Sequence, residues 1–485
     1  MNWEEIGRQF LYVEEQPLLF HQGLFLLLFA FFLVCYSFVV KHKSPREYLI
    51  IIFSAYFYYK SSGIFILLLL TTISVDYLFS IWLAYEKNKL KRKWILASAV
   101  LFSLSFLLYF KYKNFFISNY DTLTGTKHTL SQLILPIGIS FYTFQSISYL
   151  ADIANRTIKR PVFQNYLMYM LFFPHLVAGP IVRARDFLPQ LTKKIKFDKR
   201  LLNESFYLIL KGLMKKAIIA DYVAQYADIV FSAPDGFSGS ELILASLCYT
   251  LQIFCDFSGY TDMAIGIALL LGYRLCLNFD SPYKALNITN FWRRWHISLS
   301  SWLRDYIYIP LGGNRKGFLL QIVFLFLTML VGGFWHGADW KFVFWGAGHG
   351  MLLILHKLWV KFFGKYLKSS WFNMCSWFIT FSCVSLLWIP FRAVSMESTW
   401  VIYKRIFTIV DFNMVFAVLK SNPSLFLLLV LGYASTLLKG KWKTKLYTYF
   451  GKQGLLIKFI GLILVIQLMI QMRSSVVQPF IYFQF

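Results

Sequence analysis

The sequence predicts an all-α, multi-pass integral membrane protein. Of its 485 residues, 58% are hydrophobic and only 15% are charged, whereas globular domains carry roughly 25% charged residues. The apolar residues are gathered in long runs, and a run of about 20 residues is what a helix needs to cross a bilayer. Basic residues are concentrated between the runs, as expected for the cytoplasmic loops of a membrane protein.

The apolar runs predict about 11 to 13 transmembrane helices, with re-entrant or interfacial helices beside them. The first run, residues 23–40, follows a segment that carries four glutamates, the wrong charge for a cleavable signal, so we expect a spanning helix there. Residues 203–232 and 240–273 exceed one crossing, and we expect these helices to be tilted, broken or extended beyond the bilayer. The other predicted spans are residues 47–59, 63–85, 94–110, 131–150, 163–182, 317–334, 341–362, 372–392, 424–438 and 453–472.

The net charge of +26 indicates membrane topology rather than nucleic-acid binding. A nucleic-acid protein would present a soluble domain with a basic face, but here the lysines and arginines lie between apolar runs, most densely in residues 86–93. The lipid bilayer is therefore the expected partner, with basic loops in the cytoplasm and the N-terminus outside. Because no internal repeat or linker is evident, we expect one membrane domain over residues 1–485.

Proline and glycine interrupt two of the apolar runs, at residues 136–138 and 174–180. Backbone groups freed at such breaks must be buried in protein or line a wet cavity. Each break alone is compatible with an ordinary kinked helix, but together they predict a centre built from broken helices.

Polar and aromatic residues are concentrated in residues 290–339, which makes this stretch the leading site candidate, because titratable groups are costly at membrane depth. Helical spacing places Trp292, Trp295 and His296 on one apolar face. Arg293 and Arg304, about three turns apart, share another face. One interpretation is an interfacial amphipathic helix with arginine at the headgroups and tryptophan as its anchor. A re-entrant helix of this kind can also wall a site. A packing role is the usual explanation for a lone histidine such as His296.

His336 has stronger indications of chemistry. Gly332, Gly333 and Gly337 surround it and leave space for a ligand. Asp339, three residues on, is within helical reach of the imidazole and can orient it. A buried imidazole stays neutral, and a neutral imidazole can accept a hydroxyl proton as a general base. The alternative is a core histidine bonded to a carbonyl.

The remaining titratable residues favour structure over chemistry. His349 and His356 are seven residues apart, whereas metal-binding helices use i, i+4 spacing, so packing is predicted for both. Asp256 and Asp262 do not share a helix face, so we expect them to bond to neighbouring helices, arginines or broken backbone. The six cysteines show no metal-ligand spacing. We predict no metal and no bound cofactor.

Several long motifs together resemble the membrane-bound O-acyltransferase (MBOAT) family, in particular its bacterial alginate O-acetyltransferase branch. The first is Phe291-Trp-Arg-Arg-Trp-His296-Ile-Ser-Leu-Ser-Ser-Trp-Leu-Arg304, continuing to Pro310-Leu-Gly-Gly-Asn-Arg315, and the second is Trp335-His336-Gly-Ala. The resemblance covers roughly residues 20–400. Supporting motifs lie at residues 135–145, 173–181, 256–262 and 278–283.

The resemblance implies an MBOAT fold, with funnels from both membrane faces that meet at a thin wall. His336 matches the family's catalytic histidine and His296 the second motif position. An acetyl group is expected to leave a cytoplasmic thioester, acetyl-CoA, for hydroxyls of a cell-envelope polysaccharide. In alginate-type systems a separate extracytoplasmic transferase of the SGNH type completes the transfer. The implied location is the bacterial cytoplasmic (inner) membrane.

Within that chemistry, the site residues take definite roles. Acyl transfer needs a base and donors for the developing oxyanion; His336 is the expected base, and His296 or the Trp295 indole the donor. Arg293, Arg294 and Arg304 are suited to the phosphates of coenzyme A, although snorkelling explains these arginines as well. Two alternatives remain: transfer of D-alanine or another acyl group to teichoic acid, and a non-enzymatic transporter or flippase. The Leu311–Arg315 run, which the D-alanyl branch usually lacks, favours acetyl.

Overall fold

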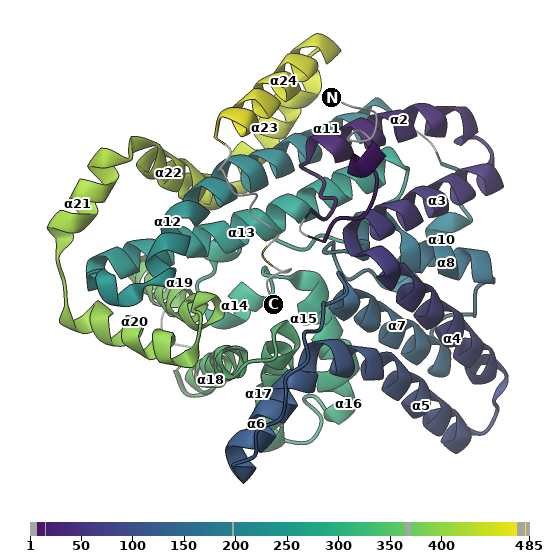
Figure 1. Ribbon diagram of the computed structural model, residues 1–485, viewed down its shortest axis with the longest axis horizontal. Helices are drawn as coiled ribbons and strands as arrows, with labels where there is room; N and C mark the ends of the chain where they lie inside the picture. Colours follow the sequence, from purple (N-terminus) through teal and green to yellow (C-terminus); the bar gives the residue numbers. More distant parts are fainter. Residues whose placement is uncertain (1–6, 15, 196–197, 364–369, 473–480, 482–485) are drawn as a thin grey trace. The chain divides into compact units, whose positions relative to one another are not determined.

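The protein is entirely helical in the part described by the computed structural model, residues 7–14, 16–195, 198–363, 370–472 and 481 (Figure 1). These residues contain helices and connecting segments and no β-strand. The predicted all-helical class is therefore confirmed. Three of the four N-terminal glutamates that argue against a cleavable signal, Glu4, Glu5 and Glu15, lie outside the described residues.

Five helical stretches of the described residues are long and apolar enough to cross a membrane, judged by length and composition. They are Lys43–Tyr85, Lys89–Thr124, Gly239–Leu270, Phe318–His336 and Trp371–Arg392. Two bent helix pairs raise the number to seven if each pair forms one span. The protein is thus a multi-pass membrane protein, while the figure of 11 to 13 crossings stays a prediction.

The chain forms two compact units. The first comprises Met1–Ser205 and Ala264–Cys276, and the second comprises Phe206–Met263 and Leu277–Phe485. The single domain over residues 1–485 that the sequence predicts stays a prediction.

The first unit is built from helices that follow the early apolar runs. The second and third runs are separated at Gly63, which has a positive φ of 60° and begins the short helix η1. Its elements are α2 (Gly23–Val39), α3 (Lys43–Ser62), η1 (Gly63–Phe65), α4 (Ile66–Tyr85), α5 (Lys89–Leu107), η2 (Leu108–Tyr112), α6 (Lys113–Thr124), α7 (Ile139–Ala154), α8 (Phe163–Leu171), α9 (Phe173–Leu176) and α10 (Ala184–Leu191).

Both predicted helix breaks lie in this unit, and the second is buried throughout. Gly138 starts α7 with a φ of 78°, and a Cβ there would lie 2.8 Å from the carbonyl oxygen of Leu176. His175 is buried beside the second break, and its Nε2 lies 2.9 Å from the carbonyl oxygen of Tyr169. The breaks therefore meet protein rather than lipid, as backbone at membrane depth requires.

The second unit contains the candidate site. Helices α11 (Lys199–Leu213) and α13 (Gly239–Leu270) each have residues in both units. The other elements are η3 (Met214–Ala220), α12 (Asp221–Ser232), η4 (Pro234–Gly236), η5 (Pro282–Lys284), α14 (Ile288–Trp292), α15 (Ile297–Leu303), η6 (Arg304–Tyr308), α16 (Ile309–Leu311), α17 (Phe318–His336), α18 (Trp340–Phe363), α19 (Ser370–Arg392), α20 (Met396–Thr408), α21 (Phe412–Ser421), α22 (Pro423–Leu437), α23 (Gly440–Lys452) and α24 (Leu455–Gln471).

The two long predicted runs differ in structure. Residues 203–232 are interrupted by the π-helical turn η3, whereas 240–273 is mostly the single 32-residue helix α13. The π-helical turn carries Lys216, which is 1% exposed and lies 2.9 Å from Asp221 and 3.0 Å from Asp256 of α13. Asp262 pairs with two other lysines. The aspartates therefore join helices, as expected, but through lysine rather than arginine.

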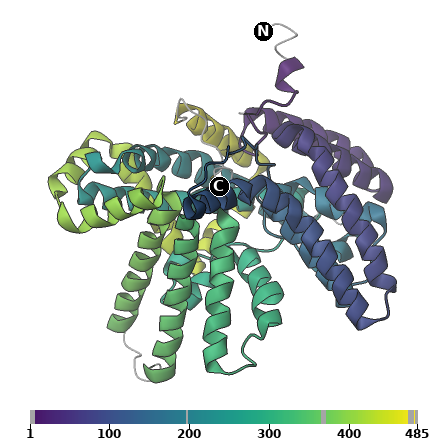
Figure 2. The ribbon, with the colours of Figure 1, turned by 60° about the horizontal axis from the view of Figure 1, so that its bottom comes forward.

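Helices α17 and α18 form an antiparallel hairpin, and α19 lies beside α18 (Figure 2). The hairpin closes through glycine: a Cβ at Gly333 would lie 2.4 Å from the carbonyl oxygen of Phe342 and 2.9 Å from the Cα of Gly346. Only residues without a side chain allow the two backbones to approach this closely. This contact fixes the position of His336, three residues further along α17.

Candidate functional site

His296 does not lie on a continuous helix, so the predicted amphipathic helix from Trp292 is wrong. Helix α14 ends at Trp292 and α15 begins at Ile297. His296 lies between them in the left-handed conformation, with φ 41°. The face shared by Arg293 and Arg304 is lost with the continuous helix.

Asn278 causes this break. The N–H groups of Ile297 and Ser298 would reach back to carbonyls of the preceding turn in a helix. Instead they donate to the backbone oxygen of Asn278 (2.9 Å) and to its Oδ1 (3.2 Å). A distant residue thus provides better partners than the local helix, a tertiary effect that spacing rules do not capture.

The same asparagine orients the His296 ring. Asn278 Oδ1 accepts from the Ser298 N–H, which identifies it as the oxygen, and it lies 3.1 Å from His296 Nδ1. Nδ1 is therefore the protonated nitrogen, and Nε2 is the acceptor of a neutral ring. Burial lowers the pKa of His296 to about 3, so the ring is neutral at physiological pH.

His336 is the last residue of α17 and is 4% exposed. Aromatic side chains surround it: its ring centroid lies 4.9 Å from that of Trp335, 5.0 Å from Trp345 and 5.1 Å from Phe391. Trp335 also packs edge-on to His296, with their ring centroids 6.3 Å apart. The fold therefore brings the two predicted histidines to one aromatic cluster, although they are 40 residues apart in sequence.

Asp339 has a capping role. Helix α17 ends at His336, so helical reach does not apply beyond it. The Asp339 Oδ1 accepts from the backbone N–H of Lys341 at 2.9 Å, at the start of α18. An aspartate in this position satisfies a donor that a helix start leaves unpaired. Its predicted role in orienting the imidazole stays a prediction.

The predicted phosphate-binding arginines are half-buried or exposed and are bonded mostly to nearby protein groups. Arg294 donates to Asn290 Oδ1 (3.0 Å) and to Asp280, whose backbone oxygen is 3.0 Å away. Arg304 pairs with its neighbour Asp305 at 2.7 Å, and Arg293 is exposed. Nothing in these contacts joins the arginines to His336.

Trp295 is part of the aromatic packing. It is 1% exposed, stacks on Phe291 with ring centroids 5.6 Å apart, and contacts Trp388 at 4.9 Å. Its predicted donor role stays a prediction.

The two histidines of α18, for which packing is predicted, differ from each other. His356 Nδ1 lies 2.9 Å from the Thr289 hydroxyl. His349 is fully buried, and neither of its ring nitrogens has a hydrogen-bond partner within the described part of the chain. Its ring contacts Trp345, the neighbour of His336, at 4.7 Å. Sequence reasoning missed Asn278, which positions the His296 ring.

No group of three or more histidine, cysteine, aspartate or glutamate side chains among the described residues is arranged to hold a metal ion. The site instead consists of two buried imidazoles surrounded by aromatic side chains. An imidazole can accept and donate protons, so the arrangement is suited to proton transfer.

Comparison with known proteins identifies the family. The model of the MBOAT, membrane-bound O-acyltransferase family, matches residues 51–395, more than half of the chain. The chain belongs to the membrane-bound O-acyltransferase family. The predicted family is therefore confirmed.

Two MBOAT relatives illustrate the similarity. The chain is 38% identical over 346 residues to the peptidoglycan O-acetyltransferase of Helicobacter pylori, covering 66% of this chain and 65% of that protein. It is 39% identical over 345 residues to the probable alginate O-acetylase AlgI of Pseudomonas aeruginosa, covering 68% and 64%. The alignment thus spans slightly less than two thirds of either relative.

A more distant relative belongs to a different acyl-transfer system. The chain is 28% identical over 296 residues to the teichoic acid D-alanyltransferase of Streptococcus thermophilus, covering 56% of this chain and 70% of that protein. The identity is lower than for the two O-acetylating relatives.

Proposed function

We propose that this MBOAT protein moves an acetyl group from a cytoplasmic thioester, acetyl-CoA, across the bacterial inner membrane to hydroxyls of an envelope polysaccharide. The observation that carries the proposal is the meeting of His296 and His336 at Trp335, both buried. The names of the more similar relatives support acetyl over D-alanyl as the group transferred.

The reaction requires a hydroxyl oxygen to attack the thioester carbonyl carbon while a base takes the hydroxyl proton. In this proposal the imidazole of His336 is that base, which is suited to a buried neutral ring. The carbon–sulfur bond then breaks, the thiolate leaves, and the proton held by the imidazole neutralises it. The thioester itself supplies the driving force, and in this proposal no metal and no bound cofactor takes part.

The acceptor hydroxyl can belong to the polysaccharide or to a partner. We propose a separate extracytoplasmic transferase of the SGNH type as the partner that delivers acetyl to the polymer. This part of the proposal rests on the likeness to the alginate-type relative.

Acetyl transfer in proteoliposomes tests the function. Purified protein is given acetyl-CoA labelled in the acetyl group on one side of the membrane, and label in a glycan or partner on the other side is measured. We expect transfer by the wild-type protein and about 10²–10⁴-fold less by His336→Gln at the same protein level. If a D-alanyl carrier thioester supported transfer and acetyl-CoA did not, D-alanine would be the group transferred. If glycan crossed the membrane without covalent transfer, the protein would be a flippase.

A further inference from the structure

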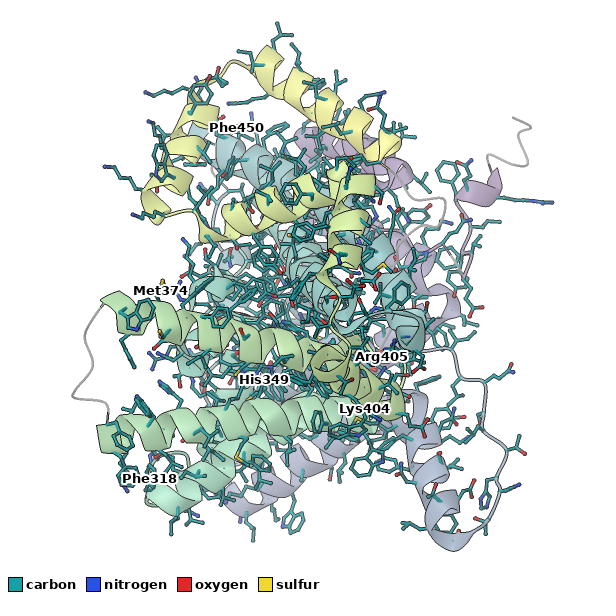
Figure 3. The ribbon with its side chains drawn as sticks, turned by 90° about the vertical axis from the view of Figure 1, so that its left-hand side faces the viewer. Phe318, His349, Met374, Lys404, Arg405 and Phe450 are labelled. Atoms are coloured by element: carbon teal, nitrogen blue, oxygen red, sulfur yellow. The ribbon has the colours of Figure 1, made fainter. Side chains whose placement is uncertain are left out.

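The environment of His349 sets it apart from the other histidine of its helix. It is fully buried within α18, the helix that packs between α17 and α19 (Figure 3). Around its ring lie Trp345 (4.7 Å), Trp292 (5.1 Å) and Phe291 (6.1 Å). A histidine used only for packing normally bonds at least one nitrogen to protein, because buried polar groups are rarely left without a partner.

The unpartnered polar atoms near His349 form a cluster. Both of its ring nitrogens and the indole nitrogens of Trp292 and Trp345 are buried and have no hydrogen-bond partner in the described portion of the chain. His356, seven residues along the same helix, is bonded to Thr289. Trp345 contacts both His349 and His336. A cluster of unpaired polar atoms at this position indicates a place where a polar group of a substrate can bind.

The register of the hairpin places His349 at a defined distance from His336. Gly346 lies against Gly333, and Gly350 lies against Met329, so His349 is level with residue 330. Six residues separate that level from His336, or about 9 Å along the helix axis at roughly 1.5 Å per residue. This distance is too great for His349 to reach the atoms that react at His336.

His349 is displaced from His336 toward the end of the hairpin that faces the cytoplasm, where the thioester donor is expected to enter. Helix α17 starts just after Arg315 and Lys316, and Lys361 near the end of α18 lies over the ring of Phe318, 4.0 Å from its centroid. This basic end of the hairpin is the cytoplasmic end by the distribution of positive charge. A thioester donor that enters from the cytoplasm would thus approach His336 from the end of the hairpin toward which His349 is displaced.

We propose that His349 binds the acyl donor, by a hydrogen bond from its imidazole to an amide of the arm that carries the thioester. The inference rests on the proposed function. A neutral imidazole offers one donor and one acceptor, and an amide offers the same pair. Coenzyme A and acyl carriers present the thioester on a pantetheine arm that contains amides. His349 is thus a substrate-binding residue, and the reacting atoms belong to His336.

The test compares His349→Phe and His349→Gln with the matched control His356→Gln. The donor KM and kcat are measured with acetyl-CoA in proteoliposomes, the Kd of coenzyme A alone is measured by titration, and the unfolding temperature is measured without ligand. Phenylalanine fills the volume without hydrogen bonds, so we expect KM and Kd to rise about tenfold. We expect kcat to remain within about twofold, because binding lost equally in ground and transition states raises KM alone.

The stability measurement separates binding from packing. Removing an unpaired buried polar group leaves the unfolding temperature unchanged or raises it, whereas loss of a structural histidine lowers it. His349→Gln keeps a donor and an acceptor and is expected to retain most of the affinity, and His356→Gln is expected to leave the donor KM unchanged.

A His349→Phe protein that unfolds more easily and binds coenzyme A normally would overturn the inference, as would one that fails to fold. Acetyl transfer that requires His336 but is insensitive to His349→Phe would overturn the inference and leave the proposed function standing. A wild-type protein that neither transfers acetyl nor binds coenzyme A would overturn both.

Discussion

The substitution Gly333→Ala tests whether the close approach of α17 and α18 positions His336. The added Cβ would lie 2.4 Å from the backbone oxygen of Phe342. An ordinary carbon–oxygen contact is about 3.3 Å or more, so the two backbones must separate by roughly 0.9 Å, the difference between these distances. Because the obstacle is backbone, no side-chain rotation relieves it.

The expected cost has two parts. Overpacking of this kind typically destabilises a protein by about 1–3 kcal/mol, partly offset by the higher helix propensity of alanine, which contributes up to about 1 kcal/mol. A misplacement of about 1 Å can also lower an enzyme's rate roughly 100-fold. We therefore expect Gly333→Ala to unfold at a lower temperature than the wild-type protein. We also expect its acetyl transfer to fall by much more than the amount of folded protein does.

The adjacent glycine provides the control. A Cβ at Gly332 would lie 3.1 Å from a terminal methyl carbon of Leu303, which can move. Gly332→Ala is therefore expected to be close to neutral in both assays, the unfolding temperature in detergent and acetyl transfer in proteoliposomes. If Gly333→Ala and Gly332→Ala behaved alike in both, the hairpin contact would not position His336.

Three further predictions concern charged and titratable side chains. His336→Gln should lower acetyl transfer by about 10²–10⁴-fold, the range of a lost general base, with the unfolding temperature retained; substantial residual activity would rule out the assignment. Lys216→Met should lower the free energy of unfolding by about 3–5 kcal/mol, because Asp221 and Asp256 lose their buried counter-charge. Denaturant unfolding measures this loss, and the double variant with Asp256→Asn should recover part of it. A double variant that recovers none of the loss would contradict the pairing. Burial lowers the pKa of His296 from 6.5 to about 3. As the pH falls, the unfolded chain therefore binds a proton at this residue at a higher pH than the native protein does. The free energy of unfolding is thus expected to fall as the pH drops from about 6.5 toward 3. His296→Gln should show less of this fall, and an identical pH dependence would refute the buried neutral ring.

Much of the protein was predictable because it follows from local properties of the chain. Apolar runs separated by basic segments predict membrane helices. The length of each run decides whether it can cross the bilayer, and the charge of each loop decides on which side the loop lies. The motifs around His296 and His336 identify the family. Gly333 and Gly337, expected to leave space for a ligand, pack against Phe342 instead. The breaks at residues 136–138 and 174–180 follow in the same way from proline and glycine.

The tertiary structure decided what depends on partners distant in sequence. Helical spacing treats residues from Trp292 onward as one helix, but Asn278 takes the N–H groups of Ile297 and Ser298 and ends it. Spacing likewise treats His349 and His356 as equivalent, because they share one face of a helix. Only the surrounding helices distinguish them, since a hydrogen bond to Thr289 satisfies one ring and buried aromatic walls surround the other.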